Sequence, residues 1–375
     1  MRNLFLIFVT VKQLTDQNLQ QMKLYIAILG GMLMIGCGHP VIQDANHDYT
    51  DTVQSEAIKP HQACNSIYYW KTTFNPTESE LNFLKKYDVK RLYIRFFDVA
   101  LDNSWLGEQL SVVPIATTVF IQSPPAAMEI VPTVYITLDA LRNIKGQEAE
   151  YAHKILTRIR AMATRHKISN INEVQFDCDW TGTTQESYFE LCRIARDTLH
   201  MRGIGLSATI RVHQLRKDPP PVDRGVLMLY NTGALKSADT ENSILNYSDI
   251  EFYLKNAVYP LHLDFAYPTF SWGVWFRDNK FRAILRTINC SDRTYYQSLA
   301  KGTYTVIKNH YLGSHELLRG DVIRLENSHY VEILKTKYQV EKELGRDNYS
   351  IILYHLDSAN LSKYTPNELT YMYNR

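Results

Sequence analysis

The chain has 375 residues, and its 41 Lys and Arg side chains nearly balance 39 Asp and Glu, for a formal net charge of +2. This balance gives no reason to expect DNA or RNA as a partner, because nucleic acids are bound by surfaces with a clear excess of positive charge. Hydrophobic residues make up 45% of the sequence, which is typical of a globular protein with a large core.

The N-terminal 37 residues read as an export signal. From Met22 the sequence is MKLYIAILGGMLMIGC, with one lysine, an apolar run over 24–35 and a small residue before Cys37. A charged start, apolar middle and small-residue exit are typical of secretory signals, and the run is short for a membrane span. The tetrapeptide 34–37 resembles a bacterial lipobox, which implies that Cys37 is lipidated and becomes the first residue of the mature protein.

The start and the anchor of the mature chain follow from this interpretation. Residues 1–21 suit no single signal, so we expect translation to begin at Met22; the alternative is an N-terminal core helix. Residues 38–63 are polar and without periodicity, which predicts a flexible tether. We therefore expect an exported cell-envelope protein, anchored to a membrane by lipid at Cys37, with the outer membrane favoured over the inner one.

After the tether, short runs rich in β-branched and aromatic residues alternate with amphipathic helical segments. Predicted strands cover 66–74, 90–98, 129–137, 172–180, 204–213, 225–232, 261–268 and 350–357. Predicted helices cover 148–166 and 185–201, and a shorter one runs to Lys86 with Thr77 as its N-cap.

Eight strands alternating with helices predict a (β/α)8 TIM-type barrel over 64–375, with an open α/β sheet as the alternative. The pattern is irregular in 101–128, and the link after the fifth strand is too rich in proline for a helix. Segment 278–349 contains strand-like pieces of its own, which predicts an insertion or a small subdomain there. Cys178 and Cys192 lie in apolar patterns and are expected to be buried thiols.

The fourth predicted strand ends with two carboxylates. Alternation places Gln175, Asp177 and Asp179 on one face, which we expect to point into the barrel mouth, where TIM barrels carry their active sites. Crowding two like charges raises the pKa of at least one of them and can keep an acid protonated near neutral pH. Asp177 and Asp179 are therefore the candidate catalytic residues; the alternative is that they accept hydrogen bonds from a buried Arg or from backbone groups and brace the barrel.

Other polar and aromatic residues lie at or near predicted strand ends, and together they predict a polar pocket. The candidate substrate-binding residues are Tyr69, Trp70, Arg95, Asp98, Trp180, Arg211, His213, Tyr230, Asn231, Tyr267, Trp272, His355 and Asp357. We find no glycine-rich nucleotide fingerprint, Ser nucleophile elbow or zinc-binding HExxH pattern, and expect no cofactor and no metal. The alternative is a divalent ion such as Ca²⁺ or Mg²⁺ held by Asp177 and Asp179, for which two Asp on one strand are a weak signal.

Two segments resemble family 18 glycoside hydrolases, the chitinase-like barrels. Asp177-Cys178-Asp179-Trp180 is similar to the DxDW part of the family's DxxDxDxE motif on strand four, and Met228-Leu229-Tyr230-Asn231 is similar to its Met-x-Tyr-Asp segment on strand six. The resemblance implies a barrel that binds N-acetylhexosamine polymers and uses the substrate's acetamide as nucleophile. It implies that Asp179 orients this acetamide and that Tyr230 helps to bind it.

The sequence departs from the family pattern at the proton donor. Thr181 stands where the family has Glu, Val174 where it has the first Asp of the motif, and Asn231 where it has the strand-six Asp. The whole chain also resembles a set of uncharacterised lipoproteins from anaerobic Gram-negative bacteria, which share its DCDWT and LSATIR stretches. That likeness implies no activity.

Three functions remain open at this point. The first is a glycoside hydrolase or lyase, in which Asp179 would be the acid and Asp177, Asp98 or Asp357 its partner. The second is a barrel that has lost the acid and binds a glycan without cleaving it. The third is a structural or assembly lipoprotein. Exposed aromatic faces in the cleft would favour the second, and buried carboxylates and aromatic residues the third.

Overall fold

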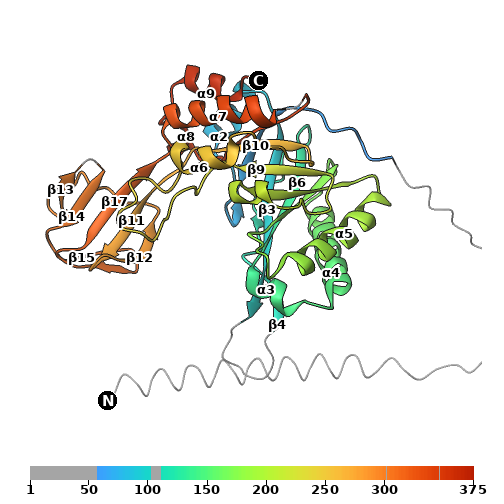
Figure 1. The fold of residues 1–375 in the computed structure, drawn as a ribbon, viewed down its shortest axis with the longest axis horizontal. Coiled ribbons are helices and arrows are strands. Elements are labelled where there is room, and N and C mark those ends of the chain that lie inside the picture. Colours follow the sequence, from blue (N-terminus) through green and yellow to red (C-terminus); the bar gives the residue numbers. More distant parts are fainter. Residues whose placement is uncertain (1–56, 103–110, 301, 346) are drawn as a thin grey trace, which may run out of the picture. The chain divides into compact units, whose positions relative to one another are not determined.

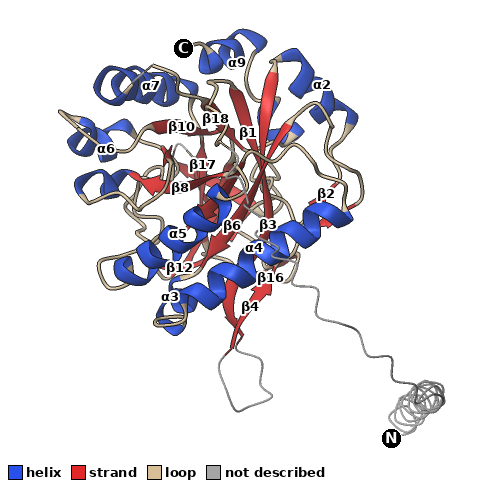
Figure 2. Cartoon of the chain, turned by 90° about the vertical axis from the view of Figure 1, so that its right-hand side faces the viewer, coloured by secondary structure: helices blue, strands red, loops and turns tan. Residues whose placement is uncertain are grey.

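Eight parallel strands pair edge to edge until the last meets the first. The computed structural model describes residues 57–102, 111–300, 302–345 and 347–375. Within them the barrel order is β1, β3, β6, β7, β8, β9, β10 and β18, and β1 pairs with both β18 and β3 (Figure 2). The strands are β1 (Asn65–Tyr69), β3 (Val89–Asp102), β6 (Glu129–Ile136), β7 (Glu173–Asp177), β8 (Gly205–Arg211), β9 (Arg224–Met228), β10 (Leu263–Pro268) and β18 (Ile351–Tyr354). The predicted (β/α)8 barrel is confirmed, and the open sheet is excluded by this closure.

Helices cover the outside of the barrel (Figure 1). They are α2 (Glu78–Lys86), α3 (Leu138–Asn143), α4 (Glu148–Arg165), α5 (Gln185–His200), α6 (Tyr247–Leu254), α7 (Tyr330–Leu344), α8 (Ser358–Leu361) and α9 (Pro366–Tyr373). Thr77 caps α2 as predicted, and Glu80 completes a capping box. The proline-rich link after β8 forms only a short 3-10 helix, η1 (Val212–Arg216).

The irregular segment after β3 contains short strands. β3 has 14 residues, and its last part pairs antiparallel with β4 (Ser111–Ile115). Further along, β5 (Val119–Phe120) pairs with β2 (Thr73–Phe74), which follows β1 after a short bend. The predicted first strand at 66–74 is therefore two strands, because the chain leaves the barrel after Tyr69.

A second sheet follows β10 directly. It is antiparallel, with the order β12 (Lys280–Leu285), β11 (Ser271–Arg277), β17 (Val322–Asn327), β14 (Thr303–Val306) and β13 (Tyr296–Ala300). Between β14 and β17 in the sequence, β15 (His310–Leu312) and β16 (His315–Leu317) form a small separate hairpin. The segment 278–349, where an insertion was expected, thus contains most of this sheet and, at its C-terminal end, helix α7 of the barrel layer. The sheet itself begins at Ser271.

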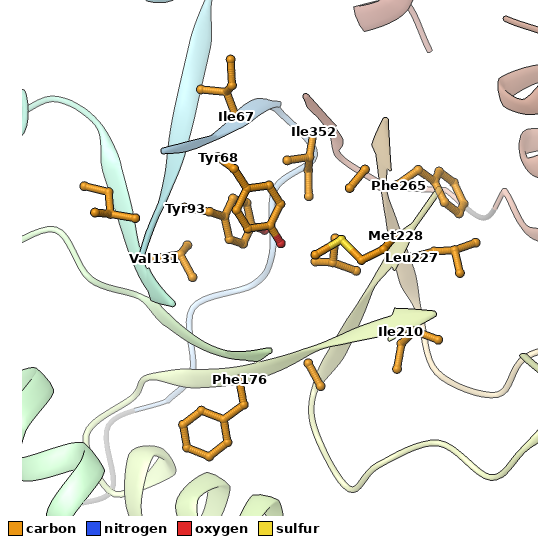
Figure 3. Close-up of a cluster of buried hydrophobic side chains, with 14 of the residues drawn as sticks. Ile67, Tyr68, Tyr93, Val131, Phe176, Ile210, Leu227, Met228, Phe265 and Ile352 are labelled. Atoms are coloured by element: carbon orange, nitrogen blue, oxygen red, sulfur yellow. The ribbon is translucent and has the colours of Figure 1, made fainter. Parts of the chain in front are cut away.

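Tyrosine and amide side chains fill the middle of the barrel. The hydroxyl of Tyr68 donates to Oε1 of Gln175 at 2.6 Å, and Nε2 of Gln175 donates to Ser207 at 3.3 Å. Tyr68 packs on Tyr93 with a ring distance of 4.9 Å. Figure 3 shows both tyrosines pointing into the barrel and Phe176 pointing away from it. The alternation of side chains predicted for the fourth barrel strand, β7, is confirmed by this arrangement: Gln175 faces the interior and Phe176 faces outward.

Charged side chains lie at the base of the barrel, the end where the strands begin. Arg91, Glu173, Arg224 and Asp264 are all buried there. The guanidinium of Arg91 pairs with Glu129 at 3.0 Å, and Nη1 of Arg224 lies 3.6 Å from Asp264. The interior therefore changes from charged at the base to tyrosine and amide groups in the middle.

The predicted signal, the anchor at Cys37 and most of the tether lie outside the described residues. None of the described helices is long and apolar enough to cross a membrane. Cys178 and Cys192 are buried and unpaired, as predicted.

Candidate functional site

Arg211 contacts both carboxylates predicted on the fourth barrel strand, which is β7: Asp177 at its end and Asp179 two residues further on. Its Nη2 is 3.2 Å from Oδ1 of Asp177, and its Nε pairs with Oδ1 of Asp179. Thr209, two residues earlier on β8, donates its hydroxyl to the same oxygen of Asp177 at 2.7 Å. Both carboxylates thus meet one arginine, which is the bracing arrangement that the sequence left open as an alternative.

The two carboxylates differ in exposure. Asp177 is 5% exposed, whereas the side chain of Asp179 is 48% exposed. Burial raises the pKa of Asp177, and the neighbouring Asp179 raises it further, while Arg211 and the Thr209 hydroxyl lower it; the net direction is upward. The expected upward shift is therefore present at Asp177, and burial is its main cause.

A second ion pair and a tyrosine share this end of the barrel. Arg95 makes two hydrogen bonds to Asp98, of which Nε to Oδ1 measures 2.8 Å, and Asp98 is buried. Tyr135, at the end of β6, is half-buried, and burial followed by the charges of Asp179 and Asp177 raises its pKa to about 12. Its hydroxyl therefore stays protonated and can donate a hydrogen bond.

Aromatic rings gather around Tyr354 at the end of β18. Its ring lies 4.8 Å from Tyr230, 5.7 Å from Phe270 and 6.0 Å from Trp70. The Arg95 guanidinium lies 5.5 Å from the Trp70 ring. Trp70 and Tyr354 are half-buried, so the cluster keeps part of its surface open beside the ion pairs.

Trp272 extends this cluster toward the second sheet. Its ring lies 4.9 Å from Phe270, and its Nε1 donates to Glu326 at 2.6 Å. Glu326 is buried and also pairs with Arg324 of the same strand. The indole is therefore fixed in orientation, while the residue remains half-buried.

His355 and Asp357 lie next to the aromatic cluster. Asp357 caps α8 by accepting from the backbone N–H of Asn360 at 3.1 Å, and it lies 3.3 Å from Nζ of Lys71. The imidazole of His355 is half-buried, and its Nδ1 has no hydrogen-bond partner within the described part of the chain. Burial is the largest cause that lowers the pKa of His355 to about 4.

His355 is expected to make stability depend on pH. An unfolded His titrates near a pKa of about 6.5, so the unfolded chain binds more protons than the folded one between this value and about 4. The His355 contribution is therefore present above pH 6.5 and lost as the pH falls toward 4. In urea unfolding over this range, the wild type should lose more stability than His355→Gln. Parallel losses in the two proteins would contradict a neutral, buried imidazole.

Three of the predicted binding residues lie away from the mouth, and this corrects the sequence interpretation. Tyr69 points outward and donates its hydroxyl to the Thr73 carbonyl at 2.9 Å. Trp180 is fully buried against Tyr188 and Phe189 of α5. Tyr267 is fully buried, and after burial the charge of Glu341 on α7 is the largest cause that raises its pKa. Alternation explains Tyr69 and Tyr267, because each is the immediate neighbour of a strand residue that faces the interior. Trp180 lies beyond the end of β7 and packs against α5 instead.

The other candidates stay near the strand ends. His213 lies in η1 and is exposed, and its pKa is lowered, first by partial burial and then by the charge of Lys217. Tyr230 is buried in the aromatic cluster, and Asn231, next in the chain, is exposed with a positive φ of 55°. The hydroxyl of Thr181 lies 3.0 Å from that of Thr183.

Sequence reasoning missed Tyr135, Phe270 and Tyr354 as members of the site. Tyr354 could have been found, because alternation along 350–357 gives it the same face as Ile352, which points toward the interior. Phe270 follows β10 in the turn to the second sheet, and no periodic pattern extends to that position.

The arrangement suits binding of a neutral polar molecule. Ion-paired carboxylates and guanidinium groups accept and donate hydrogen bonds, and the aromatic rings supply a flat apolar surface. Within the described residues, no group of three or more His, Cys, Asp or Glu side chains is placed to hold a metal ion.

The strand pairing defines the class of the protein as a (β/α)8 barrel with an appended antiparallel sheet. No family model matches the sequence, and no curated protein matches it.

Solved structures with similar backbones include chitinase-like enzymes. The chain is similar to the spore cortex-lytic enzyme SleL of Bacillus cereus, at 15% identity and a TM-score of 0.45, over 79% of this chain and 72% of that one. It is also similar to the Group IV chitinase of Ostrinia furnacalis, at 12% identity and a TM-score of 0.47, over 83% and 98%. A family 18 N-acetylglucosaminidase from Paenibacillus barengoltzii matches at 11% identity and a TM-score of 0.41, over 79% and 96%.

Proposed function

We propose that the protein is a lipid-anchored protein of the cell envelope, attached through Cys37, whose barrel mouth binds a carbohydrate without cleaving it. The observation that carries this proposal is the pair of half-buried aromatic rings of Trp70 and Tyr354 at the strand ends that also carry two ion-paired carboxylates. Aromatic faces pack against the C–H surfaces of sugar rings, and the neighbouring ion pairs can hydrogen-bond to hydroxyl groups.

Hydrolysis is the less favoured function because Asp177 and Asp179 are both paired with Arg211. A glycosidase needs a protonated acid beside the scissile bond and a second carboxylate as base or nucleophile. Asp179 is held in an ion pair by Arg211, and position 181 carries a threonine. The second candidate function is a hydrolase that uses Asp177 as acid, and the raised pKa of Asp177 is the observation that favours it.

A glycan screen separates these functions. Protein that begins after Cys37, and its Asp179→Asn variant, are tested for retention on immobilised N-acetylhexosamine polymers and other envelope glycans, and soluble products are read by mass spectrometry. We expect the wild type to be retained without releasing products. Asn keeps the shape of Asp179 but loses its charge, so retention of the variant should weaken while its fold is unchanged.

The other outcomes are equally informative. Products released by the wild type and absent with Asp179→Asn would establish an Asp-dependent hydrolase and reject the binding barrel. Products that persist in the variant would remove Asp179 from the site. Neither retention nor products across the panel would contradict both functions and favour a structural lipoprotein.

A further inference from the structure

An apolar groove lies on the outside of the barrel between α4 and α5. Its volume is about 650 Å³. It is lined by aliphatic side chains from both helices and from the starts of β7 and β8, among them Leu156, Ile159, Ile171, Leu199 and Ile204. Leu156, Ile171 and Ile204 are only half-buried. The groove therefore presents accessible aliphatic surface at the base of the barrel, the end opposite the aromatic cluster.

Three cations surround this groove, and none of the described residues that line it is a carboxylate. Arg160, Lys167 and Arg202 are exposed at its edge. None of the three makes an ion pair with another described residue. The nearby pairs of α4 and α5 involve other side chains: Lys154 with Glu150, Arg193 with Glu190 and Asp197, Arg196 with Asp197, and His200 with Asp223. The groove thus combines an apolar floor with an uncompensated positive rim, which is complementary to an anionic amphiphile.

The chain from the N-terminus reaches the barrel at the same end. Residues 58–62 border a cavity of about 580 Å³ together with Asn172 and Gly205, which are the sequence neighbours of the groove residues Ile171 and Ile204.

Side-chain contacts fix this entering segment. The imidazole Nε2 of His61 lies 3.3 Å from Asp264, and the side-chain amide of Asn348 donates to the His61 carbonyl at 2.6 Å. The polypeptide that connects to Cys37 therefore leaves the barrel from its base, beside the groove and away from the mouth.

We infer that the base of the barrel docks on a bilayer surface containing anionic lipids, with an acyl chain in the α4–α5 groove and lipid phosphates at Arg160, Lys167 and Arg202. This contact is separate from the lipid on Cys37 and goes beyond glycan binding. Cations near an anionic leaflet are attracted to it, and an apolar groove beside them adds the burial of hydrocarbon. The docked barrel turns its mouth away from the membrane.

Lipid proximity can be measured in the full-length chain reconstituted in vesicles. A fluorophore on Thr164→Cys reports from the groove edge, and one on Gly182→Cys reports from the mouth end, where a Cβ meets no atom within 4 Å. Vesicles contain nitroxide-labelled lipid in phosphatidylcholine, with or without phosphatidylglycerol. Signal from native thiols is subtracted with the unsubstituted chain. With phosphatidylglycerol, quenching at position 164 should be roughly threefold or more above that at position 182.

Charge variants decide whether the rim causes the contact. Removing the rim charges with Arg160→Gln, Lys167→Gln and Arg202→Gln should abolish the excess quenching at position 164. The matched control removes three exposed cations of the second sheet, with Lys280→Gln, Arg282→Gln and Arg293→Gln, and should leave it intact. Glycan retention should be unchanged in both variants, so a failure of glycan binding does not affect this test.

Three results would overturn the inference. Equal quenching at the two positions would show that the base does not face the bilayer. Equal quenching at position 164 in neutral and anionic vesicles would show that charge plays no part. Unchanged quenching in the rim variant would show that these three cations do not hold the barrel at the bilayer.

Discussion

Replacing Trp70 with alanine is expected to weaken glycan retention about tenfold or more, which corresponds to about 1.4 kcal/mol. The ring of Trp70 contacts Tyr68 and Tyr354 and keeps part of its face open at the mouth. Aromatic contacts contribute about 0.5–1.5 kcal/mol beyond the burial of their area, so loss of the indole removes both components. Isothermal titration with the retained glycan would measure the effect.

Two variants control for indirect effects of this change. Trp70→Phe keeps an aromatic face and should retain most of the affinity. Tyr311→Ala removes an aromatic ring that is 70% exposed on the β15–β16 hairpin and should have no effect. Wild-type affinity in a folded Trp70→Ala protein would remove the aromatic cluster from the binding site.

Replacing Arg211 with leucine is expected to lower the free energy of unfolding by about 3 kcal/mol or more at pH 7, because it leaves a buried carboxylate without its partner. Asp177 is 5% exposed, and of its hydrogen bonds to described residues the variant keeps the one from the Thr209 hydroxyl. Asp179 is half-exposed, and its pair with Arg211 should contribute much less. Denaturant unfolding measures the loss.

A second substitution and a change of pH test the cause. Arg211→Leu combined with Asp177→Asn removes the unpaired charge and should recover much of the lost stability. Without Arg211 the pKa of Asp177 rises further above its unfolded value. Stability gained from protonated Asp177 is present at low pH and lost as the pH rises through this raised pKa, so the deficit of Arg211→Leu should shrink on acidification. Equal deficits in the single and double variants would contradict a buried ion pair.

The barrel could be predicted because each strand carries its own local signal. Short runs such as 129–137 and 261–268 are apolar, rich in β-branched or aromatic residues and bounded by turns, so each predicts a strand without knowledge of its neighbours. Strand ends were less predictable. The first strand ends at Tyr69 rather than Phe74 because of tertiary pairing between β2 and β5, which leaves no mark in the sequence around Phe74.

The site could be predicted only in part, for a similar reason. Alternation along one strand predicts that Asp177 and Asp179 point toward the mouth. Their common partner Arg211 comes from the next strand, β8, and the sequence does not show which of the two carboxylates its side chain contacts. The prediction for Tyr69 and Tyr267 was wrong because nearness to a strand end does not decide which face a side chain occupies. Alternation along β1 and β10 puts both side chains on the outer face of the barrel. Phe270 belongs to a turn, where no periodicity exists to read.

The hydrogen-bonded interior of the barrel has a consequence for how this sequence can change over evolutionary time. In a barrel packed with branched aliphatic residues, one side chain can be exchanged for another of similar volume at little cost. Here Gln175 accepts a hydrogen bond from Tyr68 and donates one to Ser207, so an apolar residue at position 175 leaves the Tyr68 hydroxyl without this acceptor. Accepted substitutions at these positions should therefore occur as matched sets, and related chains should show either the whole network or none of it.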